Sequence, residues 1–273
     1  MTEIAYAMLF LAGGTWLAGV FGAAGAAPFK RNSIVANTLV PAFAAGVILM
    51  VAFVELLHPA IHLAERTSVM PAWIVVPGSF AAGFLIAATF AMHIEKSQRF
   101  KCKQGVMLLS ALSAHSVPEG LALGVLLAAT GGIGEERLLV LAPVFLAVAL
   151  HKFPEGAAVA ALFRSDGKGK FASFVFGQAS GFLAFVSGAI GFAVVVNFDA
   201  ALPFAMAFAA GAMLRVATGE LIPHAKSKNF HLCAAGIFFG IFLMLFVDTT
   251  LHLHHNGCAC EEHTFIWQRS QSS

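Results

Sequence analysis

The chain has 273 residues, of which 59% are apolar and only 11% charged, and its mean hydropathy is +0.84. Soluble domains carry about 25% charged residues, so this composition excludes an ordinary soluble protein and indicates a membrane protein. The formal net charge of +2 comes from basic residues spread among several connections, which gives no sign of a nucleic-acid partner.

Eight apolar stretches are long enough to cross a bilayer, since a spanning helix needs about 20 apolar residues. The connections between them are too short for a separate soluble domain. We therefore predict an all-α polytopic membrane protein with one eight-span transmembrane domain over residues 1–251 and a tail over 252–273. The predicted spans cover residues 4–27, 34–57, 72–93, 105–129, 138–163, 171–196, 201–223 and 230–251.

Basic residues predict how the chain is oriented in the membrane. The connections after the even-numbered spans hold only Arg66 and Arg137. By the positive-inside rule the odd connections face the cytoplasm and both termini are extracytoplasmic. We expect a plasma membrane, or the inner membrane if the source is bacterial. Glu3 is the only charge ahead of the first span, which argues against a signal peptide. Eleven of the 16 basic residues follow odd-numbered spans: Lys30, Arg31, Lys96, Arg99, Lys101, Lys103, Arg164, Lys168, Lys170, Lys226 and Lys228.

The second and seventh spans share one sequence pattern. Ala-Phe-Ala-Ala-Gly at 42–46 recurs at 207–211, and at an offset of 165 residues 11 of 19 positions are identical, Glu55 and Glu220 among them. The predicted topology makes these two spans run in opposite directions. Chance similarity between alanine-rich helices is the alternative. We predict an inverted repeat of spans 1–3 and 6–8 around a central pair, spans 4 and 5, as in many secondary transporters.

The central pair carries two copies of a polar motif. His-Ser-Val-Pro-Glu-Gly lies at 115–120 in the fourth span, and His-Lys-Phe-Pro-Glu-Gly lies at 151–156 in the fifth. In each copy the histidine and the glutamate share a helix face. Ionisable groups at this depth are costly and usually functional, and imidazole with carboxylate suits Zn²⁺ and similar ions. The motifs predict a divalent-cation site formed by His115, Glu119, His151 and Glu155; a buried hydrogen-bond network that ties the two spans together is the alternative.

Other polar residues within the spans are candidates for supporting roles. Lys152 lies three residues before Glu155, close enough to pair with it. Gln178 in the sixth span could add an amide oxygen ligand, although ordinary interhelical hydrogen bonding explains it as well. Arg215 has no obvious ligand role, and we expect a buried ion pair with Glu220 or Asp248.

Polar residues near the span ends predict way-stations on either side of the central site. The outer set comprises Glu55, His58, Asp248 and His252, and the inner set His93, Glu220 and His224. For each residue the alternative is an interfacial side chain that meets headgroups and water.

The tail contains several side chains that can ligate a metal: His254, His255, Cys258, Cys260 and His263. They predict a metal-binding tract, with a disordered tail or an oxidised cysteine pair as the alternative. Cys102 and Cys233 are expected to be free thiols.

At the twin motifs the sequence resembles the ZIP (Zrt-, Irt-like protein) family of divalent metal transporters. The resemblance extends over all eight spans and includes His-Ser-Val-Pro-Glu-Gly-Leu-Ala-Leu-Gly at 115–124. It implies uptake of Zn²⁺ or, in some members, Fe²⁺, Mn²⁺ or Cd²⁺, by an elevator-like motion of one helix group against another. Dimers are common in the family, so a homodimer is among the expected partners. Carried over by position, the four motif residues named above form the primary metal site.

The match to the family fails at the adjacent second metal site of some members. Ser116 stands where an asparagine is usual, and Lys152 stands where an acidic or amide residue is usual. The glutamate expected after Ser180-Gly181 is absent. We therefore expect one central metal, with Lys152 supplying the charge of the second. The histidine-rich loop usual between the third and fourth spans is also missing, which removes the basis for metal sensing there.

The function predicted from these observations is uptake of divalent transition-metal ions into the cytoplasm by alternating access. The metal is the transported substrate, and no organic cofactor is expected. An intramembrane metalloenzyme is the rival from another class, but the chain has no His-Glu-x-x-His stretch and every motif carboxylate is needed as a ligand. A passive metal channel or a metal sensor is the remaining alternative.

Overall fold

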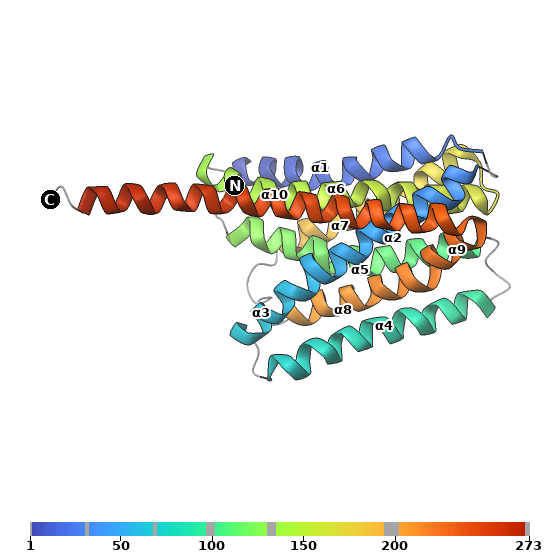
Figure 1. The fold of residues 1–273 in the computed structure, drawn as a ribbon, viewed down its shortest axis with the longest axis horizontal. Coiled ribbons are helices and arrows are strands. Elements are labelled where there is room, and N and C mark those ends of the chain that lie inside the picture. Colours follow the sequence, from blue (N-terminus) through green and yellow to red (C-terminus); the bar gives the residue numbers. More distant parts are fainter. Residues whose placement is uncertain are drawn as a thin grey trace.

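A computed structural model describes residues 2–30, 33–67, 70–96, 102–129, 135–193 and 202–270 of the chain. Over these ranges every regular element is helical, and the helices lie side by side in one bundle (Figure 1). The all-α prediction is confirmed for the described residues. Six regular α-helices are α1 (Thr2–Ala26), α4 (Ala72–Lys96), α5 (Lys103–Ala129), α6 (Glu135–Ser165), α7 (Lys170–Ala193) and α10 (Phe230–Ser270).

Two further helical rods contain π-helical turns. The first runs through η1 (Val35–Leu39), α2 (Val40–Met50), η2 (Val51–Leu57) and α3 (His58–Thr67). The second runs through α8 (Leu202–Val216), η3 (Ala217–Leu221) and α9 (Ile222–Lys228).

Each π-helical turn ends two residues before a proline, at Pro41, Pro59 and Pro223. A proline lacks the N–H for the usual helical bond and its ring crowds the carbonyl four residues earlier, so the helix widens just ahead of it. Glu55 and Glu220 lie inside these widened turns. Such turns occur frequently at functional sites.

Within the part of the chain that the structure describes, five helical segments are long and apolar enough to cross a membrane. The outer helices α4 and α10 also expose large apolar side chains, among them Leu85, Ile86, Phe238 and Phe242. Apolar surface on this scale requires a lipid environment, so the protein is a multi-pass membrane protein. The five segments are Val35–Arg66, Ala72–Lys96, Lys170–Gly191, Pro203–Lys228 and Phe230–Thr250.

Glycines allow close packing at two matching helix crossings. Where α2 crosses α10, a Cβ on Gly46 would lie 2.3 Å from the carbonyl oxygen of Ile237. Where α8 crosses α4, a Cβ on Gly211 would lie 2.0 Å from the carbonyl oxygen of Phe80. Gly46 and Gly211 occupy equivalent positions in the two similar spans. At both crossings only glycine lets the backbones approach this closely.

The twin-motif helices are packed in the same way against other partners. A Cβ on Gly120 of α5 would lie 2.2 Å from the Ala184 carbonyl oxygen on α7. One on Gly156 of α6 would lie 2.3 Å from the Gly19 carbonyl oxygen on α1. The glycine that ends each motif therefore fixes its helix against a neighbour, directly beside the motif's glutamate.

Both chain ends lie at one end of the bundle, together with α3 (Figure 1). At the opposite end the connections are joined by polar contacts. The Gly105 N–H donates to Asp166 Oδ2 at 3.0 Å, and Arg164 Nε donates to the Phe29 carbonyl at 3.2 Å. Cys102 and Cys233 are buried free thiols, as the sequence predicts.

Candidate metal centre

Helices α5 and α6 bring the two polar motifs together inside the bundle. Ser116 and Glu119 come from α5, while His151, Lys152 and Glu155 come from α6. All five side chains are buried, and Lys152 and Glu155 are only 1% and 0% exposed. Spacings of three or four residues along each helix put these polar groups on one face. The packing of α5 against α6 then turns the two faces toward each other.

The imidazole of His151 lies between two carboxylates. Its Nε2 atom is 2.6 Å from Glu119 Oε1, and its Nδ1 atom is 3.6 Å from Glu55 Oε2. Glu55 comes from the π-helical turn η2, so a third helix contributes to the cluster. Glu55, predicted as part of an outer way-station, therefore lies next to the central cluster.

The Lys152 ammonium is surrounded by oxygen atoms. It lies 2.6 Å from Glu119 Oε2 and 3.0 Å from Glu155 Oε2, and it donates a hydrogen bond to Ser116 Oγ at 3.2 Å. An ammonium has three N–H groups, and three oxygens stand within reach of them. The pairing of Lys152 with Glu155 expected from the helix spacing is present, and the additional ion pair with Glu119 was not foreseen.

The charges of this cluster favour a cation. Three carboxylates, those of Glu55, Glu119 and Glu155, face one ammonium and one imidazole. Buried carboxylates without compensating positive charge are strongly unfavourable. A divalent ion between Glu119 and His151 would bring the charges of the described side chains closer to balance.

His115 lies on α5, four residues before Glu119, and its side chain falls outside the described residues. No three His, Cys, Asp or Glu side chains within the described part of the chain already stand in a metal-ligating arrangement. In this conformation Glu119 Oε1 and His151 Nε2 contact each other instead. The role of the four motif residues as ligands remains a prediction.

The remaining outer residues separate into two groups. Asp248 of α10 lies close enough to Glu55 for the two carboxylates to interact electrostatically. His58, by contrast, is exposed on α3, and its Nε2 atom lies 3.3 Å from that of His62. The sequence interpretation missed His62, although the four-residue spacing of the two histidines could have revealed it. The side chain of His252 lies outside the described residues.

At the inner end, Arg215 pairs with Glu220 of η3 at 3.3 Å, which decides between the two partners expected for Arg215. Gly219 leaves the room this requires, because a Cβ there would collide with the guanidinium. His224 is buried one turn further on. His93, at the end of α4, is exposed. Of the three residues predicted for an inner way-station, Glu220 thus has an arginine as its partner.

Gln178 makes the interhelical hydrogen bond that was the alternative to a ligand role. Trp16 Nε1 on α1 donates a 2.7 Å hydrogen bond to Gln178 Oε1 on α7. The bond holds two helices together, and nothing in the sequence pointed to Trp16.

In the predicted tail, the backbone of α10 continues to Ser270. The side chains of His254, His255, Cys258, Cys260 and His263 lie outside the described residues.

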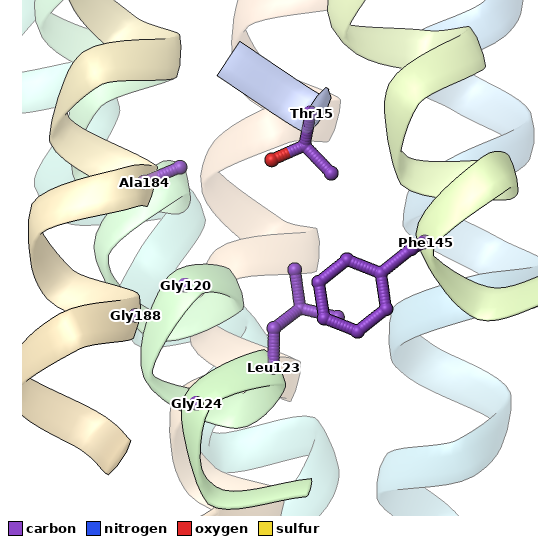
Figure 2. Close-up of a pocket in the computed structure, with 7 residues that line it drawn as sticks. All are labelled: Thr15, Gly120, Leu123, Gly124, Phe145, Ala184 and Gly188. Atoms are coloured by element: carbon purple, nitrogen blue, oxygen red, sulfur yellow. The ribbon is translucent and has the colours of Figure 1, made fainter. Parts of the chain in front are cut away.

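A small hollow lies next to the cluster, between α1, α5, α6 and α7 (Figure 2). Its volume is about 10 Å³, which is about the room that one water molecule needs. Gly120 and Gly124 line it on α5, and the ring of Phe145 lies against Leu123 (Figure 2). The hollow is too small for a hydrated divalent ion, so an ion that passed this point would require the helices to move.

Comparison with known proteins identifies the family. The family described as ZIP Zinc transporter matches residues 92–248, more than half of the chain. The zinc transporter ZupT of Corynebacterium aurimucosum is 30% identical over 220 residues, which cover 73% of this chain and 80% of that protein. Zinc transporter ZIP11 of Xenopus tropicalis and of Homo sapiens are each 34% identical, over 54% and 53% of this chain.

The match spans only 44% and 43% of those two ZIP11 proteins, less than half of their length. The bacterial match, by contrast, extends over most of both chains. These matches are to transporters, which argues against the intramembrane-hydrolase alternative. Together with the all-helical, lipid-facing bundle and the buried histidine–carboxylate cluster, they show that this chain belongs to the ZIP zinc-transporter family.

Proposed function

We propose that the protein carries divalent transition-metal ions, Zn²⁺ foremost, across a membrane into the cytoplasm. The observation that carries this proposal is the buried cluster in which Glu119, His151 and Glu155 meet between α5 and α6. Relatives named zinc transporters support the choice of zinc. Fe²⁺, Mn²⁺ and Cd²⁺ are the next candidates, since carboxylate and imidazole ligands also suit other first-row and borderline ions.

His115, Glu119, His151 and Glu155 are the proposed ligands. A hydrogen bond joins His151 Nε2 and Glu119 Oε1 at 2.6 Å, so these two proposed ligand atoms lie side by side. An incoming ion would replace the shared proton, and binding would release protons. Glu55 Oε2 lies 3.6 Å from Nδ1, within ion-pair range but beyond a hydrogen bond, and on closer approach it would orient the imidazole as carboxylates do for metal-bound histidines.

Lys152 takes the place of a second metal in this proposal. Its ammonium has the two motif glutamates and Ser116 around it, which is an oxygen set of the kind a hard or borderline cation would have. A fixed positive charge at that point competes with the transported ion for Glu119 and Glu155. Weaker binding favours release, and transport requires both capture and release.

Alternating access between two halves of an inverted repeat is the proposed mechanism. Its support is the correspondence between the halves: Gly46 and Gly211 pack their helices against α10 and α4 in the same way, and the widened turns η2 and η3 carry Glu55 and Glu220. The five apolar segments, together with the three further long helices α1, α5 and α6, are in keeping with eight spans. An ion that passed the small hollow beside Gly120 would require the helices to move, as alternating access does.

The proposed orientation puts both termini and α3 outside, in a plasma membrane or bacterial inner membrane. The helix ends that carry most basic residues lie at the opposite end of the bundle (Figure 1). That distribution is expected for the cytoplasmic side. Residues 1–251 would form the transport domain and 252–273 an extracytoplasmic tail.

Uptake into proteoliposomes tests the proposal. Purified protein would be reconstituted with a zinc-sensitive dye inside, and Zn²⁺, Mn²⁺, Fe²⁺ and Cd²⁺ would be added in turn. Losing one outer-shell partner of a bound metal already costs about 10–100-fold. Glu119→Ala or Glu155→Ala should therefore reduce uptake at least about tenfold while the folded protein is retained.

Lys170→Ala, an exposed change at the start of α7, serves as the control. Unchanged uptake in both glutamate variants would contradict the site. Non-saturating uptake at much higher rates would indicate a channel, and no uptake by the wild type would point away from transport.

A further inference from the structure

Helix α3 carries a histidine pair that the central site does not use. His58 and His62 are one helical turn apart, with ring centroids 4.7 Å apart and the two Nε2 atoms at 3.3 Å. The structure puts both rings on the exposed side of α3. The opposite side of α3 is buried, since Ala60 and Ala64 pack against Val76 and Ala207.

The spacing of the two nitrogen atoms matches that of ligands on one zinc ion. Zinc–nitrogen bonds are about 2.0–2.1 Å and structural zinc is tetrahedral, so two imidazole nitrogens on the same ion are about 3.3 Å apart. Two neutral imidazoles gain at most one hydrogen bond from such proximity. A shared metal ion would use both lone pairs.

Glu65 completes the arrangement. Its Oε2 atom lies 3.8 Å from His62 Nδ1, the nitrogen that faces away from His58, and both side chains are 60% exposed. At 3.8 Å the two groups are within ion-pair range but beyond a hydrogen bond, and a carboxylate that closes this gap fixes the ring of a ligating histidine and raises its basicity. Water can supply the remaining positions of the coordination sphere, because the site is open to solvent.

We infer that His58 and His62 bind a divalent transition-metal ion, with Glu65 as the positioning carboxylate. The site lies at the end of the bundle where both chain termini lie (Figure 1). His58 follows Glu55 by three residues on the same continuous rod, and Glu55 in turn reaches His151. The next step rests on the proposed function. The histidine pair collects ions at the outer surface and passes them toward Glu55.

Metal binding by the detergent-purified full-length chain tests the site without any need for transport. Equilibrium dialysis would give the number of Zn²⁺ ions bound per chain, and Co²⁺ would report coordination by its visible absorption. His62→Gln should bind one ion fewer per chain than the wild type. The same substitution in the Glu155→Ala background should also lower the number of bound ions by one. Glu65→Gln should keep the site and weaken it by about 10–100-fold.

His231→Gln is the matched control, because His231 is also exposed, at the start of α10, and its ring lies edge-on to the ring of Phe230. It should leave the number of bound ions unchanged. An equal ion count for His62→Gln and wild type would overturn the site. If His62→Gln loses its ion while Glu155→Ala still transports zinc normally, the surface site holds and the proposed central site fails.

Discussion

Replacing Lys152 by aspartate is the sharpest test of how the central cluster is balanced. In the wild type one ammonium contacts Glu119 at 2.6 Å and Glu155 at 3.0 Å, and all three side chains are buried. Lys152→Asp removes that positive charge and adds a third carboxylate at the same place. Without metal the variant holds like charges together. With metal it offers a second ion an acidic ligand.

The expected loss of stability without metal follows from the two ion pairs. Removing one partner of a buried pair costs about 3–5 kcal/mol, and Lys152 serves two carboxylates, so a loss of about 5 kcal/mol is expected. A change of 1 kcal/mol shifts the melting temperature by about 2–4 °C in chains of about this size. The metal-free variant should therefore melt at least about 10 °C below the wild type, and zinc should restore most of the difference.

Thermal melting with and without Zn²⁺, together with the number of ions bound per chain, measures both effects. The wild type should bind one ion at the centre and Lys152→Asp should bind two. Lys152→Met should lose stability in the same way without gaining an ion, and Lys170→Met, at an exposed position, should change neither quantity. Two central ions in the wild type, or an unchanged ion count in Lys152→Asp, would refute the reasoning.

Further predictions address the halves of the bundle and its two ends. Gly46→Ala and Gly211→Ala should each destabilise the folded protein by about 1–3 kcal/mol, because the new methyl would meet a backbone carbonyl; Gly78→Ala, with no atom within 4 Å, should not, and equal melting of all three would count against the packing argument. Glu55→Gln should raise the apparent KM for uptake, whereas Glu220→Gln should lower the maximal rate; the same kinetic change in both would contradict the assignment of outer and inner ends. Arg215→Met leaves Glu220 without its 3.3 Å partner, so it should reduce the maximal rate and Glu220→Gln should have a smaller effect in that background, as a double-mutant cycle would measure.

The helices and the main candidate residues were predictable from the sequence. Long apolar stretches broken by short polar connections determine where helices lie, because a lipid-exposed backbone must satisfy its hydrogen bonds within the helix. The spacings from Ser116 to Glu119 and from His151 to Glu155 put polar groups on one helix face, so each motif could be interpreted by itself. The pairing of Lys152 with Glu155 follows from the same local geometry.

Contacts between distant parts of the chain were decided only by the tertiary structure. Glu55 reaches His151, Lys152 pairs also with Glu119, and Trp16 occupies the oxygen of Gln178. Each of these contacts depends on how far two helices approach and at which register they cross. Glycines and prolines set that geometry, through close approach at the crossings and through the widened turns before Pro59 and Pro223. Hydropathy and spacing describe one helix at a time, so they leave the distances between helices undetermined.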